Sequence, residues 1–118
     1  MGDQRHELPR DEMHRLLEEL TKEHEGDELT IELLDREFGD ESEVERLPLA
    51  YVDYDPKDDV VVVAVGGRDP RYPVVLRHFV EHPQRVLADS YGPEGGLALD
   101  ILGSDGARTI VTLHTPSL

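Results

Sequence analysis

Two histidines four residues apart, His78 and His82, are the side chains of this chain whose spacing most resembles a metal site, and Glu81 lies between them. On a helix this spacing places both imidazoles on one face, where they can hold zinc. The segment is rich in Val and Phe and ends at Pro83, so we expect an extended backbone, in which four residues span roughly 13 Å. That is too far for one ion with ligands about 2 Å away. We expect a strand histidine and a turn histidine, and only a bend at Glu81 would restore the metal site.

Four aspartates crowd one predicted turn: Asp53, Asp55, Asp58 and Asp59. Carboxylates at this density suggest calcium, but an EF-hand loop needs oxygen ligands at its first, third and fifth positions and glycine at its sixth. Counting from Asp53, the fifth position is Lys57 and the sixth is Asp58, so the pattern fails. We interpret the segment as a solvated acidic hairpin tip.

Other polar groups give weaker signals of chemistry. His14 and Glu18 lie one helical turn apart, with Asp11 nearby, but a general base also needs a cleft, and we expect a solvated pair. Gly66-Gly67 and the glycine-rich segment 92–96 match no phosphate-binding pattern, because neither a Lys-Ser/Thr pair nor a helix start follows. The sequence therefore assigns no catalytic, cofactor-binding or metal-ligating residue.

The charge of the chain excludes two classes of partner. Its 27 acidic and 12 basic residues give a formal net charge of −15 at pH 7, whereas solubility needs a magnitude of roughly 2–8. This charge repels nucleic-acid backbones and anionic membranes, so we expect neither as a partner. A basic patch could come only from one group of side chains, namely Arg68, Arg71, Arg77 and Arg85 with Tyr72 and His78. The acids are spread along the whole chain, which favours a surface adapted to high salt over a face for one basic partner.

Length and composition indicate one domain. The chain has 118 residues and no cysteine, which excludes disulfides and thiolate chemistry. It has no apolar run near the roughly 18 residues that span a bilayer. We expect a cytoplasmic protein with a single α+β domain over residues 1–118, of which residues 1–8 are flexible.

One amphipathic helix is predicted over residues 9–25. Pro9 suits the first helical turn, and Gly26 is a natural left-handed residue after the last turn. The apolar stripe between them consists of Met13, Leu16, Leu17 and Leu20. These positions share one face of a helix, so the stripe must pack against the rest of the domain.

The chain after Gly26 indicates strands and turns. The expected strands cover residues 29–33, 43–54, 60–65, 74–80, 85–88 and 97–101, with a closing strand through Val111 and Leu113. Pro48 indicates an edge or a bulge, residues 38–43 an acidic connection, and the unbroken apolar run 60–65 a central strand. The fold class is therefore α+β: one N-terminal helix followed by six or seven short antiparallel strands that form a curled sheet or a small barrel.

The last hairpin can be predicted in register. A three-residue loop, Ser104-Asp105-Gly106, places Leu99 opposite Val111 and Leu97 opposite Leu113, whereas a two-residue loop would mix the two faces. The longer loop puts Gly106 in the left-handed position, which glycine adopts without steric cost.

Several short motifs together resemble an uncharacterised family of small bacterial proteins that is catalogued as a domain of unknown function. The motifs are Leu8-Pro9-Arg10-Asp11-Glu12, His24-Glu25-Gly26, Leu47-Pro48-Leu49, His82-Pro83-Gln84-Arg85-Val86, Leu97-Ala98-Leu99-Asp100-Ile101 and Ser104-Asp105-Gly106-Ala107. The resemblance covers nearly the whole chain and implies a free-standing single-domain bacterial protein. It implies no activity, substrate or catalytic residue. Met13 departs from it, because an aromatic residue is expected there.

These observations favour an interaction module without catalytic activity that binds a protein partner or itself. The expected contact surface is the edge near Pro48 or the groove between the helix and the sheet. Two alternatives remain open. One is a small metal-dependent, hydrolase-like enzyme that uses His78, His82, Glu81 and the carboxylates of residues 53–59. The other is an acidic stress or solvation protein adapted to high salt.

Overall fold

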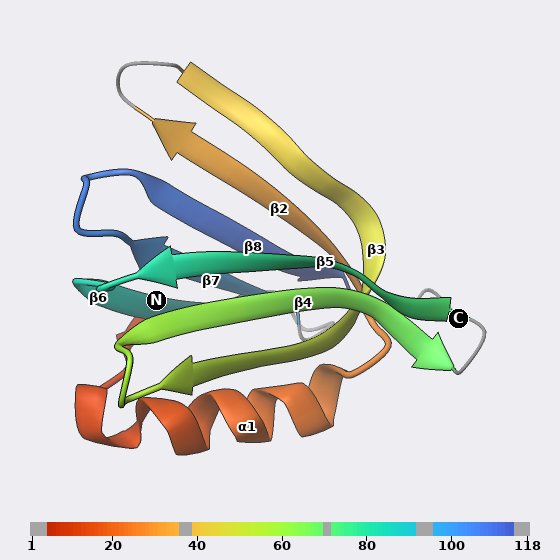
Figure 1. The fold of residues 1–118 in the computed structure, drawn as a ribbon, viewed down its shortest axis with the longest axis horizontal. Coiled ribbons are helices and arrows are strands. Elements are labelled where there is room, and N and C mark those ends of the chain that lie inside the picture. The colour runs from red at the N-terminus through yellow and green to blue at the C-terminus, as the bar shows by residue number, and fades with distance from the viewer. Residues whose placement is uncertain (1–4, 36–38, 70–71, 92–95, 115–118) are drawn as a thin grey trace.

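The computed structural model describes residues 5–35, 39–69, 72–91 and 96–114 (Figure 1). A short 3-10 turn, η1 (Arg10–Glu12), leads into the helix α1 (Met13–His24). Within these ranges the eight strands are β1 (Arg5–Glu7), β2 (Glu28–Asp35), β3 (Gly39–Asp55), β4 (Val60–Asp69), β5 (Tyr72–Glu81), β6 (Arg85–Tyr91), β7 (Gly96–Leu102) and β8 (Arg108–His114). They form one antiparallel sheet in the order β1-β6-β7-β8-β2-β3-β4-β5. The α+β class and the antiparallel sheet are confirmed.

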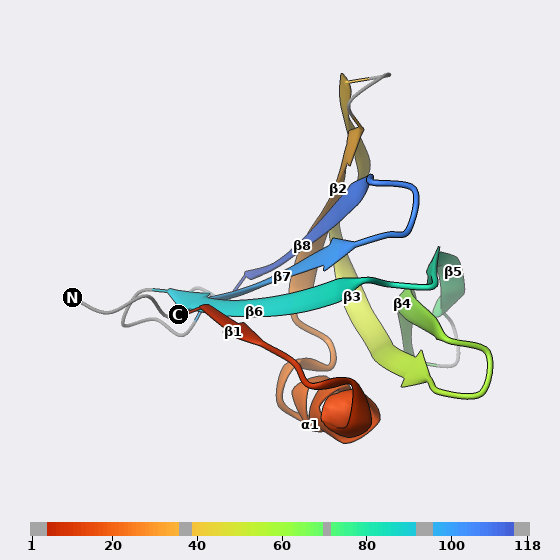
Figure 2. The same ribbon diagram turned by 90° about the vertical axis from the view of Figure 1, so that its left-hand side faces the viewer.

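The sheet is open and sharply bent, not closed into a barrel. Strand β3 is 17 residues long and pairs with β2 through its first part and with β4 through its last part. Three register shifts along β3 mark extra residues, and Arg46 beside them has a left-handed backbone with φ 55°. Because bulges increase local twist and bend a strand, β3 carries the chain from one half of the sheet to the other (Figure 2).

The helix and the residues just after it cover a backbone edge of β3 that no strand in the described ranges covers. The N–H of Gly26 donates to the Leu49 carbonyl (2.9 Å), and the Leu49 N–H donates to the Asp27 carbonyl (2.9 Å). One helical turn earlier, the Thr21 hydroxyl lies 3.0 Å from both the N–H and the carbonyl oxygen of Val52. The helix thus supplies partners that a ninth strand would otherwise give to this part of β3.

The core lies inside the bend, between the two halves of the sheet and α1. Met13 and Leu17 of the predicted stripe are buried there, while Leu16 and Leu20 are half-buried. The other buried core residues are Leu29, Ile31, Val44, Leu49, Val52, Tyr54, Val61, Val63, Val65, Val80, Val86, Leu99, Ile101, Val111 and Leu113. In most strands alternate residues are buried, which gives one buried face, whereas β4 is buried on both faces around Ala64.

Five details of the sequence-based fold need correction. Eight strands are present in the described residues instead of six or seven, and β1 precedes the helix because Arg5–Glu7 pairs with β6. The segment 1–8, expected to be flexible, therefore contains a strand, and residues 1–4 lie outside the described part. Residues 39–43, predicted as an acidic connection, are the start of β3, and residue 38 is not described.

Pro48, which indicated an edge or a bulge, lies inside the sheet between two bulges, so the second of these alternatives is confirmed. The fifth correction concerns strand order. The apolar run 60–65 forms β4, which is next to the last strand and not central. By contrast, the closing hairpin is confirmed in full: Leu99 pairs with Val111, Leu97 pairs with Leu113, and Gly106 has φ 88°.

Candidate functional site

A groove with a volume of about 710 Å³ lies between β5 and the end of the β7–β8 hairpin. We call it the β5 groove. Its walls are residues 78–81 of β5, residues 103–105 and Ala107 of the hairpin turn, and Leu33, Asp35, Gly39 and Thr109. It exists because the bent sheet brings its last strand, β5, back toward β8 without pairing with it.

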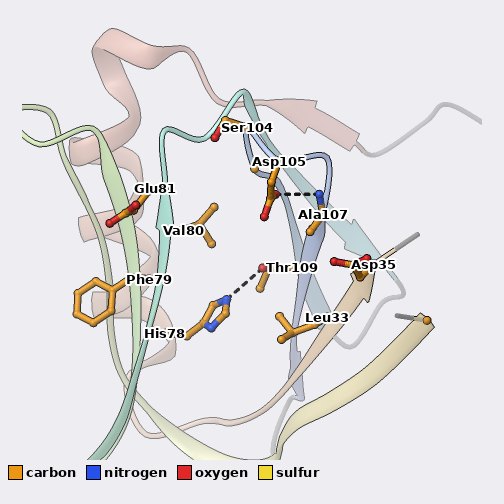
Figure 3. A pocket seen from close by; sticks show the side chains of 12 residues that line it. Leu33, Asp35, His78, Phe79, Val80, Glu81, Ser104, Asp105, Ala107 and Thr109 are labelled. Atoms are coloured by element: carbon orange, nitrogen blue, oxygen red, sulfur yellow. Dashed lines mark hydrogen bonds between the residues drawn. The ribbon is translucent and has the colours of Figure 1, made fainter. Parts of the chain in front are cut away.

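A hydrogen bond crosses the β5 groove between its two walls. The imidazole Nε2 of His78 lies 3.1 Å from the Thr109 hydroxyl oxygen (Figure 3). Val80 lies beside Gly103 on the opposite wall: a β-carbon at that glycine would be at van der Waals distance, 3.6 Å, from the Val80 side chain. In Figure 3 the side chains of His78 and Val80 point across the groove, whereas those of Phe79 and Glu81 point away from it. The groove is therefore bridged at its base and open along β5.

The polar groups of the β5 groove are mostly acidic. Asp35 and Asp105 point into it from opposite ends of the β8 side (Figure 3). Asp105 also accepts a hydrogen bond from the Ala107 N–H (3.0 Å), which fixes the carboxylate at the turn. Glu81 also lines the groove with its backbone, although its side chain points away, and none of the described lining residues is a Lys or Arg. The arrangement suits a ligand with positive charge.

A second constellation lies just beyond the end of β5, around the carboxylate of Asp59. Its Oδ1 accepts hydrogen bonds from Arg10 (2.5 Å) and from the Tyr54 hydroxyl (2.6 Å), and its Oδ2 lies 3.2 Å from His82 Nδ1. Arg10 donates further to the carbonyl of Pro83 (2.6 Å). We call this set of five residues the Asp59 cluster. It ties η1, the β3–β4 turn and the β5–β6 turn together.

The Asp59 cluster keeps its carboxylate ionised. The hydrogen bond from Tyr54 is the largest effect and lowers the pKa of Asp59. Burial opposes it, and the hydrogen bond from His82 and the charge of Arg10 lower the pKa further. Burial and the bond to Asp59 in turn raise the pKa of Tyr54. A carboxylate held by three donors is a poor general base, because its lone pairs are occupied and its proton affinity is reduced. The cluster therefore acts as a clamp at the end of β5.

Backbone geometry supports this structural role. Asp59 has φ 54° and His82 has φ 50°, both in the left-handed region, where residues other than glycine are uncommon. The His82 N–H donates to the Asp59 carbonyl (2.7 Å), so the two strained residues face each other across the ends of β4 and β5. The side-chain bonds of the cluster hold them there and fix the end of one wall of the β5 groove.

The structure does not bring His78 and His82 to a shared site. His78 bonds across the groove to Thr109, whereas His82 lies in the turn after β5 and bonds to Asp59. Within the described residues, no group of three or more His, Asp or Glu side chains could hold a metal ion. The metal-dependent alternative thus gains no support from the positions of the two histidines.

The four aspartates of the acidic turn do not converge on one site. Asp53 Oδ1 lies 2.8 Å from His14 Nδ1, and Asp55 accepts bonds from the backbone of the turn. Asp58 is exposed, and Asp59 belongs to the cluster above. His14 also lies 3.7 Å from Glu18, on an exposed helix surface and not in the groove, and the charge of Asp53 raises the pKa of His14. These groups form a solvated network, as predicted.

The two arginines of the predicted basic patch whose side chains the structure describes, Arg77 and Arg85, bond to different residues. Arg77 on β5 donates to the Tyr51 hydroxyl (3.1 Å), and Arg85 on β6 donates to Glu7 (3.2 Å). The side chains of Arg68, Arg71 and Tyr72, and the glycine-rich residues 92–95, lie outside what the structure describes. Gly66 has φ 91° at a register shift in β4 and serves the strand, not a phosphate loop.

Sequence reasoning missed Arg10, Tyr54, Thr109 and the groove itself. Arg10 and His82-Pro83 belong to two of the motifs that carry the family resemblance. That resemblance was the one sequence feature that drew attention to them, and it did not indicate that they are in contact. Their contact joins positions 73 residues apart. Thr109 carried no signal, because a threonine in a strand is ordinary.

The fold and these sites describe a small α+β domain with an open, bent sheet, one edge groove and a carboxylate clamp. The chain belongs to the family of unknown function DUF5335, whose model matches residues 4–118. It is similar to an uncharacterized protein of the bacterium Aquifex aeolicus (strain VF5), with 26% identity over 107 residues, which are 90% of this chain and 88% of the relative. No solved structure matches the chain. The resemblance seen in the sequence motifs is confirmed.

As for membranes, no helix in the described ranges is both long and apolar enough to cross one.

Proposed function

We propose that this protein is an interaction module that binds part of a partner protein in the β5 groove. The observation that carries the proposal is the position of the groove beside β5, which ends the sheet and pairs only with β4 among the described strands. An extended segment can add to such a strand by backbone hydrogen bonds and place its side chains in an adjoining hollow. The surfaces expected from the sequence are less suitable, because Pro48 lies inside the sheet and α1 packs directly on β3.

The clamp at the end of β5 supports the same function. A strand that accepts a partner must be held in place before binding, because ordering it during binding would cost affinity. The Asp59 cluster and the His78–Thr109 contact hold β5 from its end and from its inner face. We regard the cluster as positioning machinery for the groove and not as a centre of catalysis.

Site-specific photo-crosslinking in living cells tests the proposal. A photoreactive amino acid replaces Ser104 at the rim of the groove, and as a matched control it replaces Lys57 in the exposed β3–β4 turn. We expect a discrete adduct from position 104 that position 57 does not give, and mass spectrometry then identifies the attached chain. The same weak adducts from both positions, or none from position 104, would count against an interaction site in the groove.

We also infer a salt-rich cytoplasmic setting. The support is the net charge of −15, which is spread along the chain and which makes the folded state repel itself in dilute buffer. The acidic stress or solvation role remains a separate hypothesis, for which this charge is the one favourable observation.

A further inference from the structure

The direction of the backbone groups along β5 follows from contacts two strands away. Val52 bonds to Thr21 through both its N–H and its carbonyl, and the Tyr54 carbonyl lies 3.2 Å from His14 Nδ1. These groups point toward α1, away from β4. Because backbone groups alternate sides along a strand, the intervening Asp53 must direct its N–H and carbonyl toward its partner on β4, Val62.

The same alternation continues into the next strand pair. Val62 uses its backbone groups on β3, so its neighbour Val61 faces β5, where it pairs with Val80. The His82 N–H donates to the Asp59 carbonyl (2.7 Å). His82 lies two residues after Val80, so both direct their backbone groups toward the β4 side, which confirms the assignment. The even-numbered residues at this end of β5 are thus the ones that bond to β4.

The odd-numbered residues of β5 consequently present an unpaired edge. Arg77, Phe79 and Glu81 direct their N–H and carbonyl groups away from β4, and within the described part of the chain nothing hydrogen-bonds to these backbone groups. Residues 79 and 81 also line the β5 groove. The Phe79 side chain, on the outer face, is 56% exposed, which is unusual for a large apolar residue of a sheet.

Charge selects the kind of segment that can occupy this edge. Side chains of an added strand would alternate between the groove and the outer face. Those in the groove would approach Asp105, and those outside would lie beside Phe79. None of the described residues that line the groove is a Lys or Arg. An acidic strand would be repelled both by the carboxylate of Asp105 and by the net charge of −15.

We infer that the β5 groove binds an extended, cationic segment of a partner protein as an additional strand, with basic side chains toward Asp105 and apolar side chains beside Phe79. This inference rests on the proposed function and specifies its partner. The backbone of β5 supplies affinity, and the carboxylate of Asp105 together with the net negative charge selects the charge of the segment.

The probe is a synthetic octapeptide of alternating lysine and valine, and the matched control peptide has glutamate in place of lysine. Both are titrated into ¹⁵N-labelled protein and followed by NMR. We expect the lysine peptide to shift the amide signals of Arg77, Phe79 and Glu81 more than those of His78 and Val80, because only the odd-numbered amides face the groove. We expect no saturable shift with the glutamate peptide.

Two substitutions at Phe79 distinguish the contribution of its backbone N–H to peptide binding from the contribution of its ring. Phe79→Pro removes the outward N–H but no bond to β4, because proline is tolerated where the donor faces away from the sheet. Phe79→Ala removes the ring and keeps the N–H. We expect Phe79→Pro to weaken binding of the lysine peptide about tenfold or more relative to Phe79→Ala, since one lost bond of about 1.4 kcal/mol is a factor of ten. Thermal melting of both variants shows that each is folded.

Asp105→Asn tests the role of charge. The amide oxygen can still accept the bond from Ala107, so the turn is kept while the charge is removed. We expect binding about three- to tenfold weaker than in the control Asp58→Asn, with a difference that shrinks at high salt as screening increases.

The outcomes are distinguishable. Equal binding of the two peptides, shifts located away from β5, or equal binding by Phe79→Pro and Phe79→Ala would overturn the inference, as would a self-associated dimer through β5. A crosslinked partner at position 104 without binding of the lysine peptide would overturn this inference and leave the proposed function standing. Absence of both would overturn both.

Discussion

At Asp59 one carboxylate receives hydrogen bonds from three segments that are distant in the sequence: Arg10 before the helix, Tyr54 at the end of β3 and His82 after β5. The backbone of Asp59 and of His82 is left-handed, a strain on the order of 1–3 kcal/mol for each residue. Such strain persists only where surrounding contacts enforce it. The side chain of Asp59 is one of these contacts, so its charge state affects both turns.

Replacing Asp59 by Asn should destabilise the protein in a pH-dependent way. Asn tolerates the left-handed backbone as Asp does, so the change removes mainly the charge. The pKa of Asp59 is lowered from its ordinary value of 3.8, and the ionised carboxylate therefore stabilises the fold above that pH. This stabilisation is lost as the pH falls through the lowered pKa. We expect Asp59→Asn to melt at a lower temperature than the wild type at pH 7.

The difference in Tm between Asp59→Asn and the wild type should then shrink below pH 3.8. Asp58→Asn is the matched control, because Asp58 is the exposed neighbour and its carboxylate has no partner among the described residues. A difference that is constant from pH 7 to pH 3, or one equal to that of Asp58→Asn, would show that the charge of Asp59 does not hold the clamp.

Helix α1 behaves toward β3 much as a strand would. Gly26 and Asp27, just after the helix, pair with Leu49 through backbone bonds, and Thr21 within the helix bonds to Val52 through its hydroxyl. An unpaired buried edge would be costly, and an exposed one would invite aggregation. Attachment by side chains lets a helix cover a strand edge while its apolar stripe, with Met13 and Leu17, still fills the core.

Replacing Thr21 by Val should expose the weakness of this attachment. Valine has nearly the same shape but leaves the Val52 N–H without its partner, and an unsatisfied buried donor costs about 1–3 kcal/mol. We expect urea denaturation to show this loss for Thr21→Val, and hydrogen exchange at the Val52 amide to become faster. Thr21→Ser keeps the hydroxyl and serves as the control. Equal stability of the two variants would contradict the role assigned to the hydroxyl.

The sequence predicted those elements whose conformation depends on residues close together in the chain. The helix and the Ser104–Gly106 turn were predictable, because a periodic stripe or a left-handed glycine determines each nearly alone. The length of β3 was not, since bulges let the strand continue past Pro48 and no short pattern announces them. Nor was the Thr21–Val52 contact, whose partners are 31 residues apart.

The candidate site was less predictable than the fold. Its residues come from β2, β3, β5, β8 and the β7–β8 turn, so no spacing in the sequence brings them together. His78 stood out as a possible ligand, yet its role depends on Thr109, 31 residues later. The composition shows that the chain is acidic, but it does not show that carboxylates lie beside the edge of β5. That placement depends on the bend of the sheet.

Over the whole molecule the carboxylates have two opposing effects. Their mutual repulsion loosens the fold in dilute buffer, and the same field attracts a cationic segment to the β5 groove. Salt screens both interactions, since the Debye length falls from about 10 Å at 0.1 M to about 3 Å at 1 M. Added salt should therefore stabilise the folded chain and weaken binding in the groove. A measurement of stability alone isolates the first effect.

Thermal melting against KCl concentration makes that measurement. We expect Tm to rise by roughly 4–8 °C between dilute buffer and molar KCl, which corresponds to about 1 kcal/mol of relieved repulsion. The control is the triple variant Glu23→Gln, Glu25→Gln, Asp58→Asn, which changes exposed side chains and lowers the net charge from −15 to −15 + 3 = −12. Repulsion grows with the product of the charges, so the variant should melt higher in dilute buffer and respond less to KCl. A wild-type midpoint that molar KCl leaves unchanged, or equal slopes for the two proteins, would mean that its charge does not limit stability and that the surface is not adapted to salt.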